Sequence, residues 1–583
     1  MSVDLRAKPF CLNDGQAAWV ENTWKQMTLD EKIGQLFCAM VTDFSENSIQ
    51  EFMSQNFGAF MVRPMPFQGM QENIEMVQQR SKIPMLVGAN LENGGIGAFN
   101  DGTLYSMPMG ACATGDPETG YRLGKISTAE AASVGINWGF APIVDLDLNY
   151  HNPITNIRAF SDKKEDVITW ARGYMQAAIE ESVLPALKHF PGDGADERDQ
   201  HLLVSVNTLS AEDWMESYGE IYKALIDEGA PTVMVGHIAQ PAMARAVDPS
   251  ISDWEATLPA SQSKALLTGV LREKLGFNGL AITDSTLMVG FLQKMPRKDA
   301  LCAAIEGGID MILFNRNIAE DFGYMKAGYE AGKISDERLH DAVLRILATK
   351  AKLNLHVKKQ NGRVVPDIDP AAVIGNATFQ EWVKDCADKA VTLVKNKNVL
   401  PLSPEKGKRI YLNVIENKPN DKSPFAADMA RRLSSEGFDV TLRKREINVN
   451  MEDMIKGIMS EDMLRIMQEI SATTEQFVSQ YDMAMIVLNM PTESNATVVR
   501  VSWSVIAGMG NDIPWYAGEL PLVVVSFANP YHLLDIPMAD AYVNAYTDNE
   551  ATRSAVFDKL MGRSPFKGIS PVDAFCGHED CRV

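Results

Sequence analysis

Short apolar runs recur along the first part of the chain, and longer stretches with a helical spacing of apolar residues separate them. Strands that are buried on both faces read as continuous apolar runs, whereas a surface helix repeats its apolar residues about every 3.6 positions. We expect strands at residues 34–38, 57–62, 83–89, 136–144, 183–187, 232–235, 279–282 and 310–314, and helices that include 166–181, 211–228 and 261–275. This alternation predicts an α/β fold with a closed (β/α)8 TIM-like barrel.

The pattern changes near residue 355, where the basic stretch 357–363 is followed by Pro366 and Pro370. Such a change is typical of a linker. Further apolar runs follow at 410–414, 439–442, 483–488, 522–527 and 541–545, and they predict a smaller α/β sandwich with a mostly parallel sheet. The expected domains are a catalytic barrel at 1–355, a linker at 356–384 and the sandwich at 385–583.

Polar residues accumulate where five of the predicted barrel strands end. They are Asn90 and Glu92 after the third strand, Asp145 and Asp147 after the fourth, Lys188 and His189 after the fifth, His237 after the sixth and Asp284 after the seventh. These are carboxyl ends, where a barrel places its active-site loops. One such end can simply face water, but five together favour a site.

The densest group of ionisable residues is the segment 188–201, KHFPGDGADERDQH, directly after the fifth predicted strand. Gly192 and Gly194 permit backbone angles closed to other residues, so the loop can fold back over a pocket. In a tight loop Asp199 can accept a hydrogen bond from one ring nitrogen of His201 and leave the other to move protons near neutral pH. A polar surface loop with an incidental histidine is the alternative, but the position after a buried strand favours a site.

The same segment carries a family resemblance. KHFPGDG, followed four residues later by DQH, resembles the signature of glycoside hydrolase family 3, in its two-domain bacterial β-N-acetylglucosaminidase branch. There the signature reads K-H-F-P-G-H-G, four residues, then D-S-H, so Asp193 replaces the usual second histidine and Gln200 the usual serine. The resemblance implies that His201 is the general acid/base and Asp199 its partner. The family's β-glucosidases lack this pair.

A second motif surrounds Asp284. The segment 279–288, GLAITDSTLM, resembles the family's G-x-x-x-T-D-x-x-x-M motif, whose Asp is the covalent nucleophile. A carboxylate at the end of an apolar strand is held firmly while it stays open to the pocket. On local grounds alone, Asp284 or Ser285 can equally be the N-cap of the next helix.

Other strand ends resemble the family's sugar-binding residues. Arg158, in NIRAFS, matches an R-S-F or R-A-F motif, and Lys188 with His189 matches a K-H pair. The resemblance implies that these side chains bind hydroxyls of the sugar in the −1 subsite. Asn90 departs from the family, which usually has Asp at this place; an amide still bonds two hydroxyls but carries no charge. Asp145 also matches a family motif, and both a structural role beside Arg158 and direct sugar binding stay open.

Composition restricts the partners. A net charge of −21 over 583 residues argues against nucleic acid or an anionic membrane. The N-terminus has no apolar leader segment, and no run reaches the ~18 apolar residues of a membrane span, so we expect a cytoplasmic protein. The seven cysteines are scattered and predict no disulfide framework. The group Cys576, His578 and Cys581 has ligand types, but too few in too short a span, so we expect no metal.

These features predict a retaining exo-β-N-acetylglucosaminidase that acts on small oligosaccharides or glycosides. Asp284 attacks the anomeric carbon, and His201 protonates the departing oxygen and then activates water, without metal or organic cofactor. Muropeptides and chitin oligosaccharides both fit as substrates, and the sequence sets no oligomeric state.

Three alternatives remain open. A β-N-acetylglucosaminide phosphorylase is one, because a histidine acid/base does not repel an incoming anion as a carboxylate does. A β-glucosidase or β-xylosidase is another, although the D-x-H pair argues against it. The last is an inactive sugar-binding protein, which the departures at Asn90 and Asp193 keep open.

Overall fold

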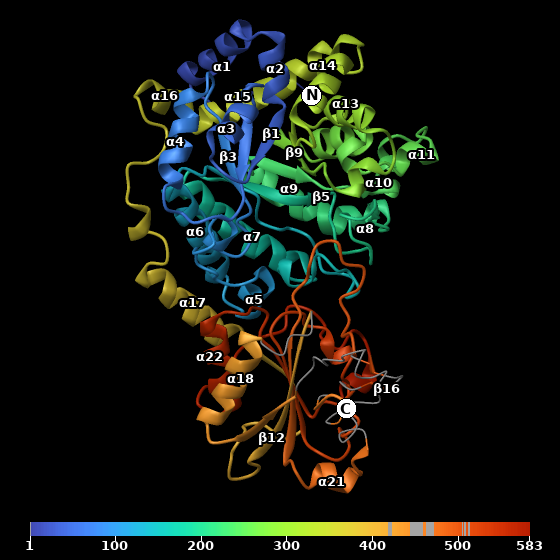
Figure 1. Cartoon of the computed structure of the whole chain (residues 1–583). Coiled ribbons are helices and arrows are strands. Elements are labelled where there is room, and N and C mark those ends of the chain that lie inside the picture. Colours follow the sequence, from blue (N-terminus) through green and yellow to red (C-terminus); the bar gives the residue numbers. More distant parts are fainter. Residues whose placement is uncertain are drawn as a thin grey trace. The chain divides into compact units, whose positions relative to one another are not determined.

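The computed structural model of the chain describes residues 2–417, 423–443, 459–461, 464, 471–503, 505–506, 509–510 and 513–583. The chain forms two compact units, a barrel surrounded by helices and a smaller sheet domain (Figure 1). The barrel unit comprises 1–112, 116–383 and 493–497, and the second unit comprises 113–115, 384–492 and 498–583.

Eight parallel strands close the barrel in the order β1-β10-β9-β7-β5-β4-β3-β2. Their bounds are β1 Phe37–Val41, β2 Ala59–Val62, β3 Leu86–Ala89, β4 Trp138–Gly139, β5 Leu184–Phe190, β7 Thr232–Val235, β9 Leu280–Ser285 and β10 Met311–Leu313. Each of them overlaps one of the predicted apolar runs, so the predicted (β/α)8 TIM-like barrel is confirmed. A short parallel pair, β6 Ser205–Val206 and β8 Ile238–Ala239, lies outside the barrel sheet.

The first strand begins at Phe37 rather than at Gly34, because the residues before it form helix α2. Thr28 is the N-cap of this helix: its hydroxyl accepts from the backbone nitrogen of Glu31 at 3.3 Å, and the Glu31 carboxylate accepts from the nitrogen of Thr28 at 2.9 Å. This reciprocal capping box begins the helix at Leu29, and the helix continues to Gln35.

Two helices precede the first barrel strand, and the other helices of the barrel unit lie between the strands or after the last one (Figure 1). They are α1 Asp14–Gln26, α2 Leu29–Gln35, α3 Glu46–Met53, α4 Met70–Arg80, α5 Pro108–Ala113, α6 Glu118–Ser133, α7 Lys164–Glu180, α8 Ala211–Trp214, α9 Glu220–Glu228, α10 Pro241–Val247, α11 Asp253–Ala256, α12 Val289–Leu292, α13 Arg297–Gly307, α14 Ile318–Glu330, α15 Asp336–Lys352 and α16 Leu355–Gln360. Two segments are π-helical, Met215–Gly219 and Ala265–Lys274. Short 3-10 turns lie at Gly95–Gly97, Asn156–Arg158, Ala260–Gln262 and Pro370–Ala372.

The stretch expected as a linker is partly ordered against the barrel. Glu75 accepts hydrogen bonds from the backbone nitrogens of Val364 and Val365 at 3.0 and 2.8 Å, and Glu130 accepts one from Gly375 at 2.9 Å. Helix α17, Ala377–Ala390, begins within this stretch.

The second unit contains a six-stranded sheet in the order β11-β18-β17-β14-β12-β13. The strands are β11 Thr392–Asn396, β12 Arg409–Glu416, β13 Asp439–Leu442, β14 Met483–Asn489, β17 Leu522–Ser526 and β18 Ala541–Asn544. Five of them are the predicted strands and pair in parallel; β11, which was not predicted, is antiparallel to β18.

Both faces of this sheet are buried. Ile410, Leu412 and Val414 of β12 belong to one apolar cluster, while Tyr411 and Ile415 belong to another. Because successive side chains of a strand point to opposite faces, the sheet is covered on both sides. The other elements of the unit are α18 Pro424–Ser435, α21 Thr474–Val478, α22 Glu550–Leu560, the 3-10 turns His532–Leu534 and Glu579–Cys581, and the pair β15 Val505–Ile506 and β16 Met509–Gly510. This α/β domain was also predicted.

Across the described ranges, no helix combines the length and apolar character that a membrane crossing requires. The seven cysteines are free thiols.

Candidate active site

The carboxyl ends of the barrel strands surround a cavity of about 460 Å³. Six of the eight predicted site residues line it: Asn90, Arg158, Lys188, His189, His201 and Asp284. The other two, Asp145 and Asp199, are buried and contact the histidines from behind. A cavity of this size holds a small molecule such as one sugar residue.

Asp284 lies near the end of β9. Its carboxylate accepts a hydrogen bond from the nitrogen of Ser285 at 2.7 Å, and Nε2 of His189 lies 3.9 Å away. Burial alone would raise the pKa of Asp284, but nearby histidines, with His189 first, outweigh it and lower the pKa below its usual value. Helix α12 begins only at Val289, so Asp284 is not an N-cap. The side chain is therefore an anion that faces the cavity.

His201 is oriented by Asp199 (2.6 Å from Nδ1 to Oδ1), and the same oxygen accepts from the backbone nitrogen of His201 at 2.8 Å. The second oxygen of Asp199 accepts from the nitrogen of Asn495, in the segment 493–497 of the barrel unit, at 2.7 Å. Burial lowers the pKa of His201, but Asp199 and then Asp284 outweigh it and raise the pKa above its usual value. With Nδ1 bonded to Asp199, Nε2 is left for proton transfer.

Glu92 ties together two of the predicted sugar-binding cations. Its carboxylate accepts from Nε and Nη2 of Arg158 at 3.0 and 2.9 Å and from Nζ of Lys188 at 2.5 Å. Burial would raise the pKa of Glu92, but Arg158 and Lys188 outweigh it and hold the pKa far below its usual range. Both cations are thus fixed before any ligand arrives.

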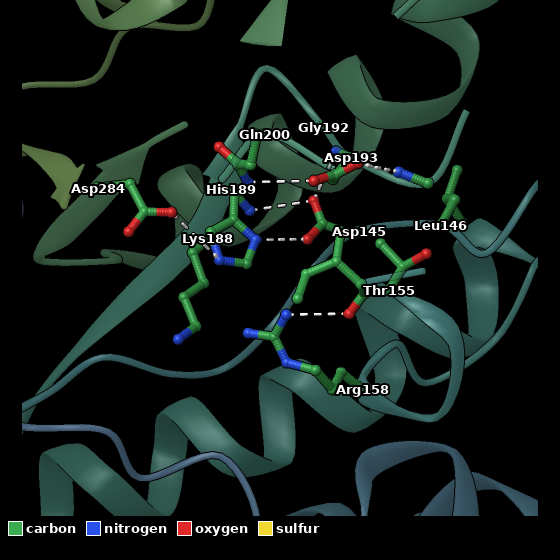
Figure 2. Close-up of polar contacts among 12 residues, drawn as sticks. Asp145, Leu146, Thr155, Arg158, Lys188, His189, Gly192, Asp193, Gln200 and Asp284 are labelled. Atoms are coloured by element: carbon green, nitrogen blue, oxygen red, sulfur yellow. Dashed lines mark hydrogen bonds and ion pairs between the residues drawn. The ribbon is translucent and has the colours of Figure 1, made fainter. Parts of the chain in front are cut away.

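Asp145 is fully buried and lies between His189 and Asp193 (Figure 2). One oxygen is 2.7 Å from Nδ1 of His189, and the other accepts from the backbone nitrogens of His189 and Asp193 at 3.0 and 2.8 Å. Nε2 of His189 then faces Asp284. Of the two roles left open by the sequence, these contacts favour a structural one, with His189 rather than Arg158 as the partner.

The turn between β5 and the His201 loop requires glycine. Gly192 and Gly194 have φ angles of +117° and +95°. A Cβ atom on Gly192 would lie 2.2 Å from the ring of Tyr218, and one on Gly194 would lie 1.9 Å from the carbonyl oxygen of Leu146. The loop can therefore follow its path only without side chains at these two positions.

Glu92 and His237 stand at predicted strand ends, but the motifs gave them no role. Nε2 of His237 donates to the carbonyl oxygen of Ser285 at 2.9 Å, and Nδ1 lies 2.9 Å from the hydroxyl of Ser261. Burial lowers the pKa of His237, so the ring is neutral and holds the end of β9 beside Asp284. The signal that could have pointed to Glu92 is that two largely buried cations, Arg158 and Lys188, require a negative charge nearby.

A cavity at the strand ends of a TIM-like barrel thus contains the carboxylate of Asp284 and a histidine oriented by Asp199, an arrangement that suits a glycosidase. The model of the family described as Glycosyl hydrolase family 3 N terminal domain matches residues 28–349. The chain belongs to glycosyl hydrolase family 3, as its motifs predicted.

Several known proteins resemble the chain along its whole length. A protein of Cellulomonas fimi named Beta-N-acetylglucosaminidase/beta-glucosidase is 38% identical over 584 residues, which is 100% of both chains. The solved structure of Beta-glucoside phosphorylase BglX has 40% identity and a TM-score of 0.90, and the match covers 99% of each chain. A family 3 β-N-acetylglucosaminidase from Paenibacillus sp. str. FPU-7 has a TM-score of 0.76 at 22% identity, over 94% of this chain and 99% of that one, and so resembles the chain in fold.

Proposed function

We propose that the chain is a retaining exo-β-N-acetylglucosaminidase in which Asp284 is the nucleophile and His201 the general acid/base. The observation that carries the proposal is that one cavity contains both the carboxylate of Asp284 and a histidine oriented by Asp199. The name of the Cellulomonas fimi relative supports N-acetylglucosaminides as substrates and adds β-glucosides. The small cavity supports removal of a terminal sugar.

The reaction has two displacements. An oxygen of Asp284 attacks the anomeric carbon while Nε2 of His201 gives its proton to the leaving oxygen, so the glycosidic bond breaks and an ester to Asp284 forms. Neutral His201 then takes a proton from water, whose oxygen attacks the same carbon and releases Asp284. The raised pKa of His201 supports the first step, because it favours the protonated ring that this step requires.

The binding of the sugar rests on Arg158, Lys188, His189 and Asn90, which line the same cavity as Asp284. Charged donors suit sugar hydroxyls because their hydrogen bonds are stronger than neutral ones. Asn90 can donate to one hydroxyl and accept from another.

Phosphate in place of water is a second candidate acceptor, and the charge of the cavity favours it. Arg63, Arg158 and Lys188 line the cavity as cations, against the carboxylates of Glu92 and Asp284. Once Asp284 is an uncharged ester, Glu92 is the one carboxylate left on the described lining. The site is then most cationic when the acceptor enters, and a phosphorylase at 40% identity supports this alternative.

The test is turnover of p-nitrophenyl β-N-acetylglucosaminide and of the matching β-glucoside, each with and without phosphate at equal ionic strength. We expect preference for the acetamido sugar, and the sugar product identifies the acceptor as water or phosphate. Asp284→Ala and His201→Ala should each abolish most turnover of unactivated substrates. Undiminished turnover in both variants would refute the assignment, and preference for the glucoside would make the chain a β-glucosidase.

A further inference from the structure

Two buried polar side chains behind the His201 loop have no part in the proposed reaction. They are Asp193 and Gln200, which are 2% and 1% exposed. Gln200 stands between Asp199 and His201 in the chain, but its side chain is buried and does not line the cavity. A buried amide or carboxylate is costly unless its hydrogen bonds are made, so their partners decide what the two side chains do.

Gln200 joins the loop to two strand ends. Its Nε2 donates to Oδ2 of Asp193 at 3.1 Å (Figure 2). Its Oε1 accepts from the backbone nitrogen of His237 at 2.8 Å. The fit is close: a Cβ atom on Gly236 would lie 2.9 Å from Oε1 of Gln200. The loop is thus held to the residues that follow β5 and to those that follow β7.

Asp193 extends these contacts to the second histidine. Its Oδ1 accepts from Nδ2 of Asn152 at 3.1 Å and from the nitrogen of Gly194 at 2.8 Å. Its own backbone nitrogen donates to Asp145, the carboxylate that holds Nδ1 of His189. One connected network therefore lies behind both His201 and His189.

We propose that Asp193 and Gln200 are a matched pair of positioning residues that hold His201 at its working distance from Asp284. This inference rests on the proposed function of His201. The pair is matched in polarity, because the amide nitrogen of Gln200 donates to a carboxylate and its carbonyl oxygen accepts from an N–H. If these hydrogen bonds of Gln200 are lost, the loop can shift, and a misplacement of about 1 Å can cost about 100-fold in rate.

The polarity allows a swap experiment. Asp193→Asn sets an amide against an amide, and Gln200→Glu sets a carboxylate against a carboxylate. In the double variant, the new amide at position 193 can donate to one oxygen of the new carboxylate at position 200, and the other oxygen of that carboxylate can accept from the nitrogen of His237. We expect each single variant to lose activity and the double variant to regain most of it, as a double-mutant cycle would detect.

The readout is kcat/KM for two substrates with the same sugar, because this constant reports the first displacement. A disaccharide needs its leaving oxygen protonated, whereas a 2,4-dinitrophenyl glycoside does not. We expect the single variants to lose roughly 100-fold on the disaccharide and only a few-fold on the dinitrophenyl substrate. A role limited to stability would lower both alike.

Two controls separate the possible failures. Gln78→Glu places a carboxylate at another buried glutamine of the barrel unit, whose amide bonds the backbone of Met85, and should show no dependence on the leaving group. His201→Ala tests the proposed function itself: if it shows no such dependence, that function fails. If His201→Ala shows it while the single variants lose both substrates equally, or the double variant does not recover, the positioning role is overturned.

Discussion

Carboxylates at the two ends of the barrel differ in their burial and in their pairing. Asp310 precedes β10 at the amino ends of the strands and is fully buried. Its oxygens accept hydrogen bonds from Arg272 at 2.7 Å, from the nitrogen of Ala281 at 2.8 Å and from Arg338. Burial and then Arg345 lower the pKa of Arg272 to about 9, so Asp310 is the anion that holds a crowded set of cations in place.

Asp284, at the carboxyl ends, has far weaker pairing. Ser285 donates one hydrogen bond to it, and Nε2 of His189 is 3.9 Å away. A partly exposed carboxylate with so few hydrogen bonds keeps an oxygen free to attack carbon. The difference teaches where to look for each effect: substitutions at the amino ends should change unfolding, and substitutions at the carboxyl ends should change rate.

Asp284→Asn should give the largest effect. An amide is a poor nucleophile, so we expect kcat/KM for the N-acetylglucosaminide to fall by about 10⁴-fold or more. The midpoint of thermal unfolding should stay nearly unchanged, because the side chain is partly exposed to the cavity and the amide keeps its shape. Steady-state kinetics and circular dichroism check the two parts; a large fall in the midpoint would place Asp284 with the structural carboxylates.

Asp310→Asn should show the reverse. Removing one partner of a buried ion pair costs about 3–5 kcal/mol, and here it leaves Arg272 and Arg338 facing each other. We expect that loss in urea unfolding and an unchanged kcat/KM for the protein that remains folded. The control is Asp299→Asn, which removes an exposed pair with Lys333 and should change neither quantity measurably. A rate loss in folded Asp310→Asn would contradict the expectation that the amino ends determine stability and the carboxyl ends determine rate.

Asp199→Asn tests the carboxyl ends of the barrel through the pH dependence of kcat/KM. Burial lowers the pKa of His201, but Asp199 and Asp284 together raise it by more, so the native rate should fall only as pH rises above the usual histidine range. Without that carboxylate the pKa of His201 drops, the alkaline fall in kcat/KM moves to lower pH, and the rate at neutral pH falls about 100-fold. A pH profile of kcat/KM checks this; an unmoved alkaline limb would assign it to another group.

The sequence predicts the barrel well because its strands are buried on both faces and so read as apolar runs, and strand ends then follow from chain order. The pairing of Asp199 with His201 was equally accessible, since two residues of one loop make it. Glu92 was not: its partners stand 66 and 96 residues away, on other strand ends. Such a triad exists only after the barrel closes, and no local spacing encodes it.

The second unit gives a similar lesson. The parallel strands of the sheet are apolar runs, but β11 contains Lys395 and Asn396 and is an antiparallel edge strand with no such pattern.

Asp193 and Gln200 were visible as departures from the family pattern, yet their hydrogen bond to each other depends on how the loop turns back after Gly192 and Gly194.

The smallest predicted effect is a change in how the free energy of unfolding depends on pH. Asp193, at the carboxyl ends of the strands, is the residue that tests it. Burial and then the charge of Asp145 raise the pKa of Asp193 to about 6, whereas an unfolded Asp titrates near ~3.9. Between these values the folded chain binds the extra proton. The contribution of Asp193 to the free energy of unfolding is therefore fully present below about pH 4 and is lost as pH rises through about 6, by roughly 2–3 kcal/mol.

Asp193→Asn removes this titration, so urea unfolding at pH 4.5 and 6.5 should show a smaller decrease for the variant than for the native chain. The absolute stability of the variant also changes because its bond to Gln200 is altered, but that change is the same at both pH values and cancels in the slope. If the two proteins show the same pH dependence, the surroundings of Asp193 compensate its negative charge as completely as the arginines compensate that of Asp310. The contrast between the barrel ends would then rest on Asp284 alone.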